Sequence, residues 1–225
     1  MPAFFFDFFQ YKTHRLLILC GMFNVEPSKC LGVGIMDRRS EILKAAYEVV
    51  GRDGLEGLHA RAVATDLGLN HSTVHYYFPT RTDLILGLID YVEERFLKDR
   101  ENILSRAENP VTKLEAEVAL YEAYCRPNSR FFRVWASLFV ASQGNENLVE
   151  RMRKFSLTLS GRFAETKNLA GYAATITNEP LTEPYTFVAT MLGLGLMAQL
   201  HGNLEDTSYR IDKIVERMFN RPADD

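Results

Sequence analysis

The stretch Gly54–Arg81, GLEGLHARAVATDLGLNHSTVHYYFPTR, decides the fold of this chain. It holds two segments with helical spacing, residues 60–67 and 71–77, separated by Gly68. Helices this short are not stable alone, so they must pack on neighbouring helices. Glycine adopts positive φ without steric cost, so Gly68 predicts a tight turn between the two segments. Two short helices joined by such a turn are typical of a helix-turn-helix.

The side chains of this stretch separate into an apolar face and a polar face. Asn70 is expected to cap the second short helix, and Pro79 to end it. Arg61, Arg81 and the N–H groups at helix N-termini are suitable partners for phosphate. The predicted small core is Val63, Ala64, Leu67, Leu69, Val74 and Phe78, and the polar groups expected to project outward are His71, Ser72, Thr73, His75, Tyr76 and Tyr77.

From Asp37 onward the apolar residues recur at helical spacing, and no strand pattern interrupts them. The sequence therefore predicts an all-α protein of about nine helices. Besides the two short ones, helices are expected at about 37–50, 80–104, 110–125, 131–139, 148–163, 185–200 and 211–219, with a loop at 170–185.

Composition excludes several classes of protein. The chain has 225 residues, 47% of them hydrophobic, and a net charge of −3, so it is not a generally basic nucleic-acid coat. Residues 37–82 carry six cations and six anions, so any contact with DNA depends on how the donors are arranged. Three cysteines are too few for a disulfide framework and fit a reducing, cytoplasmic setting. No apolar run is long enough to span a bilayer.

Residues 1–35 differ from the rest and carry six of the 15 phenylalanines. Three explanations are open. Translation can begin at Met36, which would make this segment an upstream artefact. The segment can be a poorly ordered extension. A targeting segment is the third possibility, because an apolar run, residues 16–23, follows Lys12, His14 and Arg15.

The quoted stretch resembles the DNA-binding domain of the TetR family over about residues 38–92. The positions that match the family pattern are Gly54, Arg61, Val63, Ala64, Leu67, Gly68, Leu69, Thr73, Val74, Tyr77, Phe78, Arg81 and Leu84. The resemblance implies a helix-turn-helix domain at 36–82, and a helical ligand-binding and dimerisation domain at 83–222 joined to it by a long helix.

The resemblance also implies roles for single residues. Base-edge candidates are Arg61, Ser72, Thr73 and Tyr76, and phosphate candidates are His59, His75, Tyr77 and Arg81, with Asn70 and His71 beside them. Two residues depart from the family pattern: His59 replaces the usual capping Thr or Ser, and His75 replaces a phosphate-binding Tyr. Other roles are open, since Tyr77 can be core, Arg81 a solvated cation, and His71 with His75 part of a metal site.

The resemblance implies that the middle helices enclose a small-molecule effector and that the last two helices pair with those of a second copy. Small residues between 190 and 198 permit close packing there, although the helix at 185–200 can also be buried within one subunit. Cys125 is expected to be a small buried hydrophobe, with redox sensing as the alternative. Effector-binding candidates, each of which can also be plain core, are Tyr121, Tyr124, Phe131, Trp135, Phe139, Met152, Phe155 and Met191.

No phosphate loop, nucleophile elbow or zinc-protease motif occurs in the sequence. We therefore expect a protein that is not an enzyme and has no cofactor or bound metal. The expected function is a ligand-responsive repressor that binds operator DNA as a homodimer. The alternatives are an activator or ligand-independent regulator of the same family and, more remotely, a helical protein-interaction module.

Overall fold

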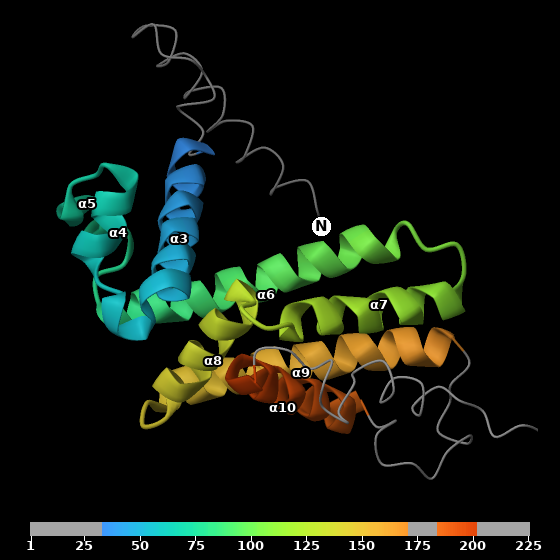
Figure 1. Cartoon of the computed structure of the whole chain (residues 1–225). Helices are drawn as coiled ribbons and strands as arrows, with labels where there is room; N and C mark the ends of the chain where they lie inside the picture. Colours follow the sequence, from blue (N-terminus) through green and yellow to red (C-terminus); the bar gives the residue numbers. More distant parts are fainter. Residues whose placement is uncertain (1–32, 171–183, 202–225) are drawn as a thin grey trace, which may run out of the picture.

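The computed structural model describes residues 33–170 and 184–201, and every element in these ranges is a helix (Figure 1). The all-α fold predicted from the sequence is confirmed. The helix expected at 211–219, most of the loop expected at 170–185, and residues 1–32 lie outside the described ranges. The elements are α3 (Val33–Asp53), η1 (Leu55–Gly57), α4 (Ala60–Leu67), α5 (His71–Tyr77), α6 (Arg81–Leu104), α7 (Pro110–Cys125), α8 (Arg130–Ser142), α9 (Glu146–Leu169) and α10 (Pro184–His201).

α3, α4 and α5 form one end of the molecule, and α6 leads away from them as a long helix (Figure 1). The first helix was expected to begin only after Met36, but α3 begins at Val33. No proline stands between these positions, so the helix continues without obstruction across the expected boundary at 35/36. α6 starts in a capping box, in which the Thr80 hydroxyl accepts from the Asp83 N–H and the Asp83 carboxylate accepts from the Thr80 N–H.

The remaining helices pack against α6 and one another as a bundle. α7 begins with Pro110 at its first turn, as predicted, and α10 lies against α7 and α9. Gly195 of α10 packs so closely on the Phe132 ring of α8 that a Cβ there would overlap the ring. This close contact is made within one subunit, whereas a Cβ on Gly193 would meet nothing within 4 Å.

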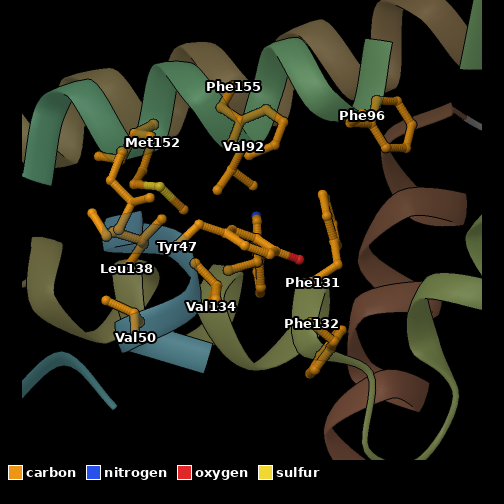
Figure 2. Close-up of a cluster of buried hydrophobic side chains, with 14 of the residues drawn as sticks. Tyr47, Val50, Val92, Phe96, Phe131, Phe132, Val134, Leu138, Met152 and Phe155 are labelled. Atoms are coloured by element: carbon orange, nitrogen blue, oxygen red, sulfur yellow. The ribbon is translucent and has the colours of Figure 1, made fainter. Parts of the chain in front are cut away.

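One continuous apolar core runs from Ile42 on α3 to Leu194 on α10. Figure 2 shows its middle, to which α3 contributes Tyr47 and Val50, α8 contributes Phe131 and α9 contributes Phe155. The residues that helical spacing predicts on the inner faces of α3, α6, α7 and α9 are buried, namely Ile42, Leu43, Ala46, Val49, Val50, Leu84, Leu88, Ile89, Val92, Phe96, Leu114, Val118, Tyr121, Cys125, Leu148, Met152, Phe155, Leu159 and Phe163. Phe139, expected to lie inside with Trp135 and Leu138, is instead 49% exposed, because it lies at the edge of the buried face of α8.

Candidate nucleic-acid interface

Gly68 sets the angle between α4 and α5. Its backbone is left-handed, with φ 63° and ψ 30°, and the Leu69 N–H donates to the Ala64 carbonyl at 2.8 Å. Val63, Ala64 and Val74 are buried below the turn. The chain therefore bends at Gly68 as the sequence predicts, and α5 is carried on a small core with one side left open.

Both short helices begin at a side-chain cap. The Asn70 Oδ1 accepts from the Ser72 N–H at 3.0 Å, which confirms the predicted cap. His59 caps α4 in the same way, since its Nδ1 accepts from the Ala62 N–H at 3.1 Å. The imidazole therefore caps α4 at the position where the family pattern has Thr or Ser. An accepting Nδ1 places the proton of the neutral ring on Nε2, where it can donate to a second group.

The open side of α5 carries most of the residues assigned to DNA. His71, Ser72, His75 and Tyr76 are exposed, and the Tyr76 side chain is 78% exposed. Thr73 and Tyr77 are half-buried, and the Tyr77 ring meets the Tyr76 ring edge-on at 5.2 Å between centroids. Phe78 is buried below them. Hydroxyls, imidazoles and an aromatic ring are therefore presented together on one short helix.

Arg81 has a structural attachment that the sequence did not reveal. Its Nε donates to the Leu58 carbonyl at 3.2 Å and its Nη2 to the Leu55 carbonyl at 2.8 Å. Arg81 thereby ties the start of α6 to the segment before α4, and only its remaining N–H groups are available to a phosphate. Arg61 is exposed and makes no ion pair with any described residue.

A groove of about 440 Å³ lies between α4, α5 and the first turn of α6. Its lining brings together most of the cationic and titratable candidates with an apolar floor, and contains no carboxylate. His71 and His75 meet edge-on at 6.1 Å between ring centroids, and no metal-binding group of three side chains occurs in the described part of the chain. The lining residues are His59, Ala60, Arg61, His71, Val74, His75, Phe78, Thr80, Arg81 and Leu84.

The effector-binding candidates lie in the bundle, well away from this groove in sequence. Phe139 is at the surface, as described above, and Tyr124 is half-buried, with its hydroxyl donating to Asp99 at 2.5 Å. Burial, together with the bond to Asp99, raises the pKa of Tyr124 above its ordinary 10.0. The Trp135 Nε1 is buried and has no hydrogen-bond partner among the described residues. The other candidates, Tyr121, Phe131, Met152, Phe155 and Met191, are buried.

A buried ion pair crosses the same bundle, and no sequence pattern indicated it. Arg100 of α6 donates to both carboxylate oxygens of Glu117 on α7, at 2.7 and 3.2 Å. It also donates to the Thr166 hydroxyl and the Arg162 carbonyl of α9. Glu117 is fully buried. Three helices are therefore held by one guanidinium whose partners lie up to 66 residues away in the chain.

The family model described as bacterial regulatory proteins, tetR family, matches residues 42–88, which hold most of α3, both short helices and the start of α6. The chain therefore carries, at these residues, the DNA-binding domain of TetR-family transcriptional regulators.

Two curated relatives each match about half of this chain. The HTH-type transcriptional regulator BetI of Brucella anthropi is 22% identical over 122 residues, which cover 54% of the chain and 63% of that protein. The nucleoid occlusion factor SlmA of Marinomonas sp. is 23% identical over 117 residues, which cover 52% and 57%. The chain thus spans less than two thirds of the length of either relative.

Solved structures extend the similarity in fold to most of the chain. A putative TetR-family transcriptional regulator from Rhodococcus sp. aligns with a TM-score of 0.67 and 19% identity, over 82% of this chain and all of that one. A putative transcriptional regulator from Saccharomonospora viridis, in complex with choline, aligns with a TM-score of 0.60 and 17% identity, over 81% and 94%. None of the helices at 33–170 and 184–201 has the length and apolarity needed to cross a membrane.

Proposed function

We propose that this chain is a ligand-responsive transcriptional repressor that binds operator DNA as a homodimer, with α5 in the major groove. The observation that supports this function is the exposed face of α5, which the Gly68 turn holds away from the core. A short helix of this kind enters the major groove in helix-turn-helix proteins. The domain at 36–82 then reads DNA, and the domain at 83–222 senses the effector and pairs the subunits.

Each exposed residue has an assigned role in this proposal. Arg61, Ser72, Thr73 and Tyr76 contact base edges or the groove, and Asn70 and His71 lie beside them. His59 donates from Nε2 to a phosphate while its Nδ1 caps α4. His75, Tyr77 and the free N–H groups of Arg81 are the other phosphate donors, because charged and polar donors position a protein on the DNA backbone.

In the first step of the test, the full chain is mixed with a pool of random DNA duplexes, and the duplexes that it binds are recovered and sequenced. Thr73→Ala combined with Tyr77→Phe is expected to abolish binding to the selected operator while the oligomeric state is unchanged. Arg106→Gln is the control, because Arg106 lies beyond the far end of α6 and its side chain donates to the nearby Asn102. Affinity should also fall steeply with salt, since phosphate contacts release counterions. Unchanged binding by the double variant would exclude α5 as the reading helix.

The dimer surface is assigned to α10 and the helix expected to follow it. One face of α10 is buried in the bundle, but the opposite face is apolar and exposed. The exposed residues recur every three or four positions, so they lie along one side of the helix. An apolar stripe of this kind is suited to an identical stripe on a second copy. It consists of Tyr185, Ala189, Gly193, Leu196, Met197 and Leu200.

Analytical ultracentrifugation tests this assignment. Leu196→Glu combined with Met197→Glu should convert a dimer into monomers at micromolar concentration, because four carboxylates would meet at the symmetric interface. Leu157→Glu is the matched control, since Leu157 is 54% exposed on α9, outside the stripe. A dimer that survives the double change would place the interface elsewhere.

The effector is proposed to be a small molecule that enters the bundle near Trp135. A buried indole N–H without a partner is costly, and an acceptor on a bound molecule would satisfy it. The similar protein from Saccharomonospora viridis was solved with choline, which supports a small-molecule effector for this chain. An effector that prefers the conformer with wrongly spaced α5 helices lowers DNA affinity, since the two must lie about 34–36 Å apart.

A thermal-shift screen that includes choline, followed by operator titration with each hit, tests the regulatory part. A hit that raises the Tm and weakens operator binding supports repression relieved by an effector. A hit that strengthens binding would favour an activator or co-repressed regulator. DNA binding that responds to no hit would favour the ligand-independent alternative.

A further inference from the structure

We propose that the groove between α4, α5 and the first turn of α6 is a second binding site, for a small aromatic carboxylate. This site is distinct from the effector site proposed in the bundle. Its volume of about 440 Å³ lies within the usual range for small-molecule pockets and accommodates one or two fused rings. The exposed lining of the groove is mostly apolar, and the buried side chains of Val74, Phe78 and Leu84 close its base.

The charged groups around the groove favour an anion. Five of its ten lining residues are imidazoles or guanidiniums, and none is a carboxylate. The neighbouring carboxylates are engaged elsewhere: Asp83 accepts from Thr80, and Asp66 binds Arg52 at 3.2 Å. Negative charge is therefore attracted to this groove even though the whole chain is acidic.

Several donors on the lining residues are free to bind a carboxylate. Arg61 makes no ion pair with a described residue, and the rings of His71 and His75 contact only each other among the described aromatic residues. His59 uses Nδ1 for the α4 cap and keeps Nε2 for another partner. A guanidinium offers paired N–H groups that match the two oxygens of a carboxylate.

An aromatic carboxylate fits better than a bare anion. Inorganic phosphate would pair with the guanidiniums but leave the exposed apolar lining in water, whereas a neutral aromatic molecule would cover that lining and leave the guanidiniums without an anion. A molecule with a ring and a carboxylate uses both. If the proposed function holds, this ligand also places negative charge where the DNA backbone must approach, so it should compete with DNA.

The test uses 2-naphthoate as the probe and reads the imidazole Cε1–H signals of the full chain by NMR. Single His→Gln variants at 59, 71 and 75 assign the signals. We expect naphthoate to shift all three signals saturably, and Arg61→Gln combined with His75→Gln to weaken binding by about tenfold or more. Arg106→Gln should leave the affinity unchanged. Both changed side chains are exposed, so the fold should tolerate them.

Two matched probes and one DNA measurement complete the test. Inorganic phosphate and uncharged 2-naphthalenemethanol should each bind at least about tenfold more weakly than naphthoate. Equal shifts with phosphate, equal affinity for the alcohol, or an unchanged affinity in the double variant would overturn the proposal. Displacement of DNA by naphthoate is measured separately. If the chain bound no DNA at all, the proposed function would fail while the imidazole signals still reported the site.

Discussion

The guanidinium of Arg130, in the first turn of α8, binds the carboxylate of Glu48 on α3. The stem of Arg130 lies against Gly51, where an added Cβ would come within 2.8 Å of the Arg130 Cδ. α8 also carries Phe131 and Trp135 into the bundle. The helix that bears three of the effector candidates, Phe131, Trp135 and Phe139, is therefore attached directly to the first helix of the DNA-binding domain.

Gly51→Ala is predicted to release this attachment. Alanine normally stabilises a helix relative to glycine by about 1 kcal/mol, but here its Cβ pushes the Arg130 stem away from Glu48. We expect the usual gain in the free energy of unfolding to be absent in urea titrations. Gly161→Ala on α9 is the control, because its Cβ meets nothing within 4 Å and the gain should appear. A full gain at Gly51 would show that the contact contributes nothing.

Gly195→Ala is predicted to destabilise the bundle. Its Cβ would overlap the buried Phe132 ring, and overpacking of this kind costs about 1–3 kcal/mol. Gly193→Ala provides the comparison, since the new Cβ would meet open space in one subunit. Chemical denaturation should give a lower free energy of unfolding for Gly195→Ala than for Gly193→Ala. Equal effects would mean that α10 can shift away from α8 without cost.

Glu117→Ala is predicted to cost about 3–5 kcal/mol in the free energy of unfolding, because it leaves Arg100 without its buried partner. Replacing both residues by Met should cost less than the single change, since no charge then remains unpaired in the core. Urea unfolding of Glu117→Met, of Arg100→Met and of the double Met variant, beside Glu117→Ala, measures this. If the double variant lost as much as the sum of the singles, the pair would not act as a unit.

Cys125 is predicted to resist alkylation in the folded protein. Burial raises the pKa of its thiol from 9.0 to about 12, and the thiol lies 3.1 Å from the Met191 carbonyl oxygen. In a Cys20→Ser, Cys30→Ser variant, iodoacetamide at pH 8 should react only after urea is added. Rapid labelling of the native protein would instead support the redox-sensing alternative.

The same raised pKa predicts loss of stability in alkali. Below pH 9 the thiol is protonated in both the folded and unfolded chains, so its contribution to stability is constant there. Between pH 9 and about 12 the unfolded thiol ionises while the folded thiol does not, so the free energy of unfolding falls. Burial also raises the pKa values of Tyr47 and Tyr121, which adds to the loss. Cys125→Ala should show a shallower decline over this range.

His59 variants are predicted to separate helix capping from DNA contact. His59→Ala removes the acceptor for the Ala62 N–H and should cost about 1 kcal/mol of stability. His59→Ser restores an acceptor but not the imidazole N–H, so it should regain stability and still bind DNA more weakly. Calorimetry and operator titration measure the two effects. Full DNA affinity in the serine variant would remove His59 from the set of phosphate donors.

Local chemistry explains which features could be predicted from the sequence. The Gly68 turn, the Asn70 cap and the start of α7 at Pro110 each depend on residues within a few positions, so their patterns are visible in the chain. The buried positions of α3 and α6 follow from helical periodicity alone. The His59 cap was missed because histidine is an uncommon residue for that role.

Features that depend on distant partners could not be predicted in this way. Arg100 and Glu117 look like ordinary surface charges until α6 and α7 are placed side by side. Arg81 donates to backbone carbonyls 23 and 26 residues away. The order of side chains does not indicate which backbone carbonyls are available to accept such a bond. Phe139 has the same helical spacing as its buried neighbours, and only the packing of the bundle leaves it outside.

The unbroken core between Ile42 and Leu194 has a consequence for protein engineering. A chimaera that joins the first 80 residues of this chain to the sensor of another regulator would cut through shared packing at Tyr47, Val50 and Gly51. Retargeting is better attempted by exchanging the outward positions of α5 alone. A graft of the larger segment should bring the facing residues of α8 with it.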